Sequence, residues 1–143
     1  MEKNQKKNPN PLRVSSLSEF KKIRQELMLG KLIELPQSKL VVKVARPSLE
    51  ELIIKDKIPK TLIATAMKVQ ARDVGPDDIK QVIQLRDFVV LLAIKEPVTV
   101  IENPTNDEIT LDSLPVSDRD FIYNYVEKGN DFLDRFSNPQ GRK

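Results

Sequence analysis

The stretch from Pro76 to Glu96 constrains the fold most, because it carries helix signals at both ends and no helix breaker between them. Proline is favoured at the first helical position, acidic residues stabilise the positive end of the helix dipole, and Pro97 ends the pattern. The first half is amphipathic, whereas every residue from Phe88 to Ile94 is apolar. We therefore predict a helix of about six turns whose second half is buried on all sides, with these residues in the core: Phe88, Val89, Leu92 and Ile94. A buried strand is the alternative for the apolar run, since it is rich in Val and Ile.

The composition of the 143-residue chain excludes several kinds of functional site. The chain contains no Cys and no His, which rules out disulfides, thiol nucleophiles, Ser-His-Asp triads and zinc sites built on Cys or His. Hydrophobic residues make up 39% and aromatic residues 5%, so we predict an aliphatic core in one domain. No run approaches the roughly 18 apolar residues of a membrane span, and no apolar region follows the N-terminal lysines. We expect a soluble protein made in a cytoplasm.

The net charge of +3 is concentrated at the two ends of the chain. Residues 1–15 contain four basic residues and one acidic residue, and residues 137–143 contain two basic residues and no acidic one. Residues 16–136 therefore carry 18 basic and 20 acidic residues, a net charge of −2. We predict a disordered basic arm over 1–15, a single globular domain over 16–136 and a disordered tail over 137–143. A mildly acidic body differs from the basic body of a typical DNA-binding domain.

A β-hairpin is predicted around the turn-forming residues Pro36 to Lys39. β-branched residues cluster on both sides of this turn, which favours strands over 32–35 and 40–46. An isolated two-stranded hairpin is marginally stable in water. This hairpin therefore needs either helices of its own chain or strands of another subunit beside it.

Helix-capping residues mark the remaining helices. Ser16 and Glu19 have the spacing of a capping box and open a helix that ends at Gly30. Its apolar residues recur at helical spacing: Leu17, Phe20, Ile23 and Leu27. Three more helices are predicted over 48–56, 60–71 and 117–129, with Ser48 and Ser117 as N-caps. The fold class is therefore α+β and mainly helical, with about five helices and one β-hairpin near residues 32–46.

Two acidic clusters, Asp77–Asp78 and Asp118–Asp120, are the candidates for catalysis or metal binding. In principle such pairs hold Mg²⁺, as in nucleases. Both clusters lie in the first turn of a predicted helix, however, where acidic residues stabilise the helix dipole. The chain has no phosphate-binding glycine motif, so we predict no enzyme activity, no cofactor and no metal. Arg86 and Asp87 are interpreted as a buried pair or as contacts to polar groups of neighbouring segments.

The predicted partner-binding residues lie on the hairpin and on the helix over 60–71. They are Val42, Val44, Leu62, Ile63 and Met67. Burial in the core is the alternative for the helix face, since small residues along it permit close packing. We predict that the protein self-associates or binds a partner helix through these two surfaces, because its helices offer more apolar surface than one thin layer covers.

The order of motifs in the chain resembles the tail assembly chaperones of long-tailed bacteriophages. The resembling pieces are Leu35–Pro36, Val41 to Pro59, Leu92 to Pro97 and Leu114 to Val126, which together span about residues 22 to 136. The most distinctive of them are Arg46-Pro47-Ser48-Leu49 and Glu96-Pro97. No single family residue is carried over to this chain.

The resemblance implies a non-catalytic protein of the host cell cytoplasm that is absent from the finished virion. Such a chaperone binds the tape measure protein, keeps it soluble and promotes assembly of tail tube subunits, and in this family a longer form is often made by translational frameshifting. A structural virion subunit of the head–tail joining type is one alternative. A nucleic-acid-binding accessory protein that places its basic tails on phosphates is another.

Overall fold

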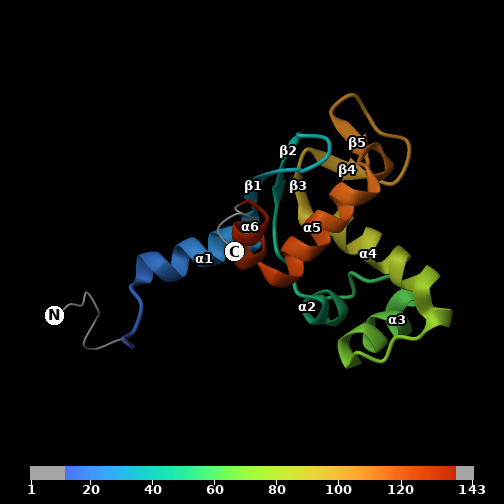
Figure 1. Cartoon of the computed structure of the whole chain (residues 1–143), viewed down its shortest axis with the longest axis horizontal. Helices are drawn as coiled ribbons and strands as arrows, with labels where there is room; N and C mark the ends of the chain where they lie inside the picture. Colours follow the sequence, from blue (N-terminus) through green and yellow to red (C-terminus); the bar gives the residue numbers. More distant parts are fainter. Residues whose placement is uncertain (1–11, 138–143) are drawn as a thin grey trace.

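The structure, a computed structural model, describes residues 12–137, so most of the predicted basic arm and tail lies outside the described residues. The helices in chain order are α1 (Leu17–Leu29), α2 (Leu49–Ile54), α3 (Lys60–Ala71), α4 (Ile79–Ala93), α5 (Val116–Lys128) and α6 (Asn130–Ser137) (Figure 1). The strands are β1 (Lys31–Glu34), β2 (Val41–Val44), β3 (Ile94–Glu96), β4 (Val98–Val100) and β5 (Glu108–Thr110), and the short 3-10 helices are η1 (Pro76–Asp78) and η2 (Leu111–Ser113). The predicted α+β, mainly helical class is confirmed.

The predicted hairpin is present as the antiparallel pair β1–β2, with Ile33 opposite Val42. It does not stand alone, because β3 adds to the other edge of β2 and makes a three-stranded sheet in the order β1-β2-β3. The pairing of β2 with β3 shifts register between Lys43 and Val44. The chain thus supplies from its own residues the neighbouring strand that a two-stranded hairpin requires.

The predicted helix over residues 76–96 is correct only as far as Ala93. Ile94 to Glu96 leave the helix and form β3, while the backbone N–H of Ala45 donates to the carbonyl of Ala93 (2.8 Å). The physical reason is that β2 has an open edge whose N–H and C=O groups need partners. A partner strand 50 residues away in the sequence is not visible in a local helix pattern.

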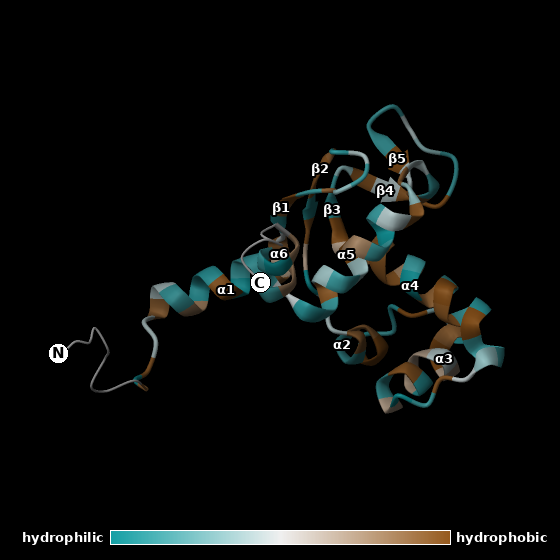
Figure 2. Ribbon diagram, viewed as in Figure 1, coloured by the Kyte–Doolittle hydropathy of each residue, from teal (hydrophilic) through white to brown (hydrophobic). Residues whose placement is uncertain are grey.

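The hydrophobic core lies where the sheet, α4 and α5 meet, with α2 and α3 covering one end. Figure 2 shows the hydrophobic residues concentrated on α4, α2 and the sheet. Of the four residues predicted to be buried in the central helix, Val89 and Ile94 are buried, whereas Phe88 and Leu92 are only partly buried. The prediction that the second half is buried on all sides is therefore wrong, because one flank of α4 reaches the surface.

Helix α5 is fastened to both the hairpin and α4 by acidic side chains. Asp118 is fully buried and accepts hydrogen bonds from the backbone N–H groups of Gln37 (2.9 Å) and Ser38 (3.0 Å). Its carboxylate therefore stabilises the hairpin turn. From the sequence, Asp118 was interpreted only as a residue that stabilises the helix dipole, and this contact was not predicted. Ser117 is not the N-cap, because α5 begins at Val116.

Ion pairs join α4 to α5 along their shared side. Asp87 accepts from Arg86 through Oδ1 (2.9 Å) and from Arg119 through Oδ2 (3.2 Å), and Arg86 also pairs with Asp120. Arg86 and Asp87 form a pair, as one interpretation had it, but the pair is only partly buried, and both residues also contact polar groups of α5, as the other interpretation had it. These half-buried charges are satisfied within the fold.

Candidate functional site

Helix α1 stands apart from the core although its sequence encodes a helix strongly. The capping box is complete, since Glu19 N–H donates to Ser16 Oγ (3.2 Å) and Ser16 N–H donates to Glu19 Oε1 (2.7 Å). Hydrogen bonds from Ser16 to the Glu19 carboxylate, above all the one from the Ser16 backbone N–H, hold the pKa of Glu19 below its usual value. None of the 13 residues of α1 is buried. Figure 1 shows the helix extending away from the rest of the described molecule.

The apolar stripe of α1 is therefore exposed to solvent. Exposed fractions are 77% for Leu17, 59% for Phe20, 54% for Ile23 and 37% for Leu27. The C-terminal end of the helix is attached to the body by the Arg46 N–H, which donates to the Leu27 carbonyl (3.0 Å). An amphipathic helix normally buries such a stripe against another element.

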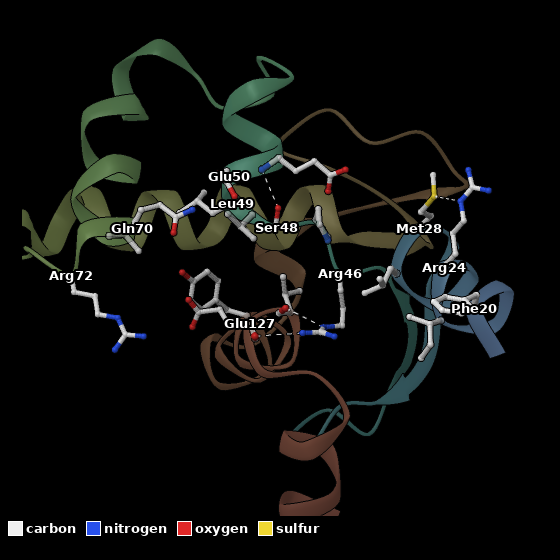
Figure 3. Close-up of a pocket in the computed structure, with 18 residues that line it drawn as sticks. Phe20, Arg24, Met28, Arg46, Ser48, Leu49, Glu50, Gln70, Arg72 and Glu127 are labelled. Carbon is white, nitrogen blue, oxygen red and sulfur yellow. Dashed lines mark hydrogen bonds between the residues drawn. The ribbon is translucent and has the colours of Figure 1, made fainter. Parts of the chain in front are cut away.

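A groove of about 910 Å³ lies between α1 and the body of the protein. We call it the α1 groove. The wall on α1 consists of Phe20, Ile23, Arg24, Leu27 and Met28. The wall on the body consists of residues 46–51, Val69, Gln70, Arg72, Val89, Tyr123, Val126 and Glu127. Figure 3 shows residues of α1 and residues of α2 and α3 on opposite sides, with Arg46 between them.

The size of the groove suits a helix. A helix with side chains is about 10 Å across and rises about 5.4 Å per turn. The volume of about 910 Å³ is close to the volume of two turns of such a helix. The apolar parts of both walls, Phe20 and Ile23 on one side and Leu49 and Val69 on the other, provide the contacts that an apolar helix face needs.

Arg46 shapes the floor of the groove by joining the loop before α2 to the end of α5. Its Nε donates to the Val126 carbonyl (3.1 Å), its Nη2 donates to the Glu127 carbonyl (3.4 Å), and its guanidinium lies 5.8 Å from the centre of the Tyr125 ring. Gly129, with φ +78°, ends α5 directly beside it. A Cβ at this position would lie 2.8 Å from the guanidinium carbon. Only glycine fits the backbone conformation and leaves Arg46 in place.

The electrostatic character of the groove differs between its walls. The charged residues on the body wall are three acidic, Glu50, Glu51 and Glu127, and two basic, Arg46 and Arg72. Among the residues of the α1 wall, Arg24 is the charged one. Burial and the neighbouring Glu127 raise the pKa of Tyr123 on the body wall to about 12, so its hydroxyl stays protonated at neutral pH.

The predicted partner-binding residues do not line this groove. Val42, Val44 and Leu62 are buried in the core, so the prediction that they meet a partner is corrected: the β2 face that carries the two valines packs against the helices of the same chain. Ile63 is partly buried against the core. Met67 is 61% exposed and is the one residue of the five that lies on the surface.

Sequence reasoning found the α1 stripe but not its exposure. Helical spacing identified Phe20 and Ile23 as one face of an amphipathic helix, and such a face usually indicates core. The additional signal is the position of Gly30, which has φ +103° and turns the chain directly into β1. Because of this turn α1 points away from the sheet. The spacing of apolar residues along the sequence does not indicate the direction of such a turn.

The acidic clusters are engaged in contacts within the fold. Asp78 accepts from the Gly75 N–H (2.9 Å) and from Lys68 Nζ (3.0 Å), and these two bonds, the first of them most, hold its pKa below the usual value. Asp120 pairs with Arg86, and Asp118 holds the hairpin turn. Residues 12–137 contain no group of three or more acidic side chains that could hold a metal ion.

The comparisons with known proteins leave the site to be interpreted from its own geometry. In the part of the chain that the structure describes, no helix has the length and apolar character needed to cross a bilayer. No protein-family model, no curated protein and no solved structure matches the chain.

Proposed function

We propose that this protein is an assembly chaperone that binds an apolar helix of a client protein in the α1 groove. The single observation that carries the proposal is that α1, a helix with a complete capping box, keeps its apolar stripe exposed beside a groove of about 910 Å³. A holdase needs such an apolar surface, and it needs a charged exterior to remain soluble itself.

The proposed client is the tape measure protein of a long-tailed bacteriophage. The resemblance of motifs to tail assembly chaperones supports this choice. Two of these motifs lie at the groove: Arg46 to Leu49 forms part of the body wall, and Tyr123 and Val126 belong to the stretch from Leu114 to Val126. The proposal assigns the protein a binding role without a catalytic step.

Co-expression tests the proposal. The soluble yield of the tape measure protein from the same phage should rise when this protein is present. Phe20→Glu and Ile23→Glu should each abolish the gain, because a charge on the α1 stripe cannot enter an apolar contact without a large desolvation cost. Both side chains are more than half exposed, so the melting temperature of the chaperone should not change.

Gln25→Glu is the matched control. It adds the same single charge to α1, but Gln25 is exposed and does not line the groove, so the gain in yield should persist. Met67→Glu tests the surface on α3 that was predicted from the sequence. Loss of the gain with Met67→Glu but not with Phe20→Glu would move the client site to α3. A tape measure protein that is equally soluble alone, or purified virions that contain this protein in stoichiometric amounts, would contradict the chaperone role and favour a structural subunit.

A further inference from the structure

We propose that the outer edge of β1 is a binding site that takes an extended peptide segment of another protein as an additional strand of the sheet. Among the described residues β1 is an edge strand, because the sheet order is β1-β2-β3 and β1 pairs with β2 alone. In this mode of recognition the main chain of the peptide gives affinity and its alternate side chains give specificity. The site shares no lining residue with the α1 groove, and it does not rest on the proposed function.

The hydrogen-bond register of the hairpin leaves backbone groups of β1 unpaired within the described residues. The N–H of Leu35 donates to the carbonyl of Leu40 (2.8 Å), so these two residues form a hydrogen-bonded pair. Such pairs alternate with non-hydrogen-bonded pairs in an antiparallel ladder. Ile33 therefore also bonds to β2, whereas Leu32 and Glu34 direct their N–H and C=O groups away from it. No described residue bonds to these outward groups, and an extended main chain is the structure that matches such a row of donors and acceptors.

A groove of about 710 Å³ borders this edge, and we call it the β1 groove. Residues 32–36 and Lys39 line it on the side of the hairpin. Phe121 of α5, together with Leu133 and Phe136 of α6, lines the opposite side, and Figure 1 shows α6 beside β1. The ring centres of Phe121 and Phe136 are 4.8 Å apart, and Phe136 is 49% exposed. An added strand would therefore lie between β1 and an aromatic wall that a ligand can reach.

The alternation of side chains along a strand determines the chemistry of this peptide. In an antiparallel strand added to β1, the residues paired with Leu32 and Glu34 place their side chains on the exposed face of the hairpin. The residues between them place their side chains on the face of Ile33, which packs in the same core as Phe121. We therefore expect bulky apolar side chains at every second position of the peptide.

Charge complementarity determines the residue of the peptide that lies opposite Glu34. The side chain of Glu34 is exposed, and no ion pair within the described residues involves it. Opposite charges on directly opposed residues of neighbouring strands stabilise the pairing. The residue opposite Glu34 should therefore be basic, and a β-branched residue suits the position opposite Leu32.

A fluorescein-labelled peptide with the sequence Ser-Phe-Lys-Ile-Thr-Leu-Asn tests the site in the full chain. In the antiparallel arrangement its lysine lies opposite Glu34 when its threonine lies opposite Leu32. Fluorescence anisotropy should show saturable binding. The peptide Phe-Ile-Leu-Ser-Lys-Thr-Asn has the same composition without the alternation, so it should not bind. An alternating peptide that does not bind at millimolar concentration would overturn the proposal.

Methylation of single backbone nitrogens separates strand addition from a general apolar contact. The N–H of the peptide's threonine faces β1, whereas the N–H of its isoleucine faces away from β1. A methyl group on the threonine nitrogen should raise the dissociation constant about tenfold or more, because a hydrogen bond to Leu32 is lost. A methyl group on the isoleucine nitrogen should have little effect. Equal losses of affinity for the two peptides would contradict the proposed strand.

Charge reversal tests the position of the peptide along β1. Glu34→Lys should raise the dissociation constant about fivefold, and a peptide with glutamate in place of its lysine should restore the affinity. Glu102→Lys is the matched control, since it reverses an exposed charge that does not line the β1 groove. A Glu34→Lys protein that binds both peptides equally would show that the peptide does not pair with this edge.

Amide hydrogen exchange followed by NMR identifies the bonded groups directly. The N–H groups of Leu32 and Glu34 should exchange rapidly in the free protein and slowly with the peptide bound. Slow exchange in the free protein would mean that another segment or a second copy already covers the edge, and the proposal would fail. Phe20→Glu should bind the peptide as the wild type does, because the two grooves share no residue. Peptide binding without client rescue would therefore overturn the chaperone role alone, and client rescue without peptide binding would overturn this site alone.

Discussion

At the scale of the residue, Asp118 joins parts of the chain that lie 80 residues apart. Its two carboxylate oxygens accept from the N–H groups of Gln37 and Ser38, and these N–H groups belong to the turn of the hairpin. The side chain is fully buried, so water does not compete for these bonds. The same carboxylate lies in the first turn of α5, where a negative charge is stabilised by the helix dipole. One side chain thus fixes the position of the sheet relative to α5.

We predict that Asp118→Ala lowers the free energy of unfolding by about 1–3 kcal/mol, because two partly buried donors lose their acceptor. Asp118→Asn should cost less, since the amide oxygen still accepts one of the two bonds. Urea unfolding measures both values. Asp107→Ala, which changes an exposed acid in the loop before β5, is the control and should have little effect. An Asp118→Ala protein as stable as the wild type would show that the turn does not depend on this carboxylate.

At the scale of the element, α4 changes from an exposed helix to a core helix and then into a strand. Its buried residues are Leu85, Val89, Val90 and Ala93. Leu92, in the middle of the apolar run, lies only partly within the core. Helical periodicity therefore describes α4 better than the unbroken apolar run does, because residues 85, 89 and 93 recur every four positions.

We predict that Leu85→Ala costs about 2–5 kcal/mol of unfolding free energy and that Leu92→Ala costs clearly less. The two substitutions remove the same atoms from the same helix, so helix propensity cancels between them. The difference arises because Leu85 is 1% exposed and leaves a cavity, whereas the site of Leu92 is open on one side. Equal losses in thermal and urea unfolding would contradict the observed burial of α4.

Local signals predicted the elements better than they predicted their surroundings. The capping box at Ser16, the N-cap at Ser48 and the turn before β2 depend on residues within four positions of one another, and each lies where its pattern indicates. The end of α4 at β3 and the role of Asp118 depend on partners far away in the sequence. For the same reason the burial of Val42 and the exposure of Phe20 were not predicted, whereas the burial of Leu62 agrees with the alternative given for its helix face.

At the scale of the whole molecule, the described structure consists of a body with a packed core and a helix that adds nothing to that core. Substitutions on the α1 stripe should therefore affect association and leave the unfolding of the body unchanged. Substitutions at Asp118 or Leu85 should do the opposite. This separation allows the binding surface to be altered while the fold is monitored independently.

The stability of the whole molecule should also fall in alkaline solution because of Tyr123. Burial, together with the adjacent carboxylate of Glu127, raises the pKa of this tyrosine from 10.0 to about 12. The unfolded chain therefore loses the proton near pH 10, whereas the folded chain keeps it until about pH 12. Because unfolding releases a proton in this window, the contribution is fully present below pH 10 and is lost as the pH rises from 10 to about 12.

Thermal unfolding from pH 8 to pH 12 measures this effect, with Tyr123→Phe as the test variant. The variant keeps the ring but has no ionisable hydroxyl, so its melting temperature should fall less steeply above pH 10 than that of the wild type. Part of the slope should remain in the variant. Burial also raises the pKa of Tyr125, and the hydrogen bond to Asp78 raises the pKa of Lys68. The stabilising contributions of these two groups therefore also decrease as the pH rises. Identical slopes for the two proteins would mean that the Tyr123 hydroxyl ionises in the folded protein as it does in the unfolded chain, and that the body wall of the α1 groove is more open to water than its geometry indicates.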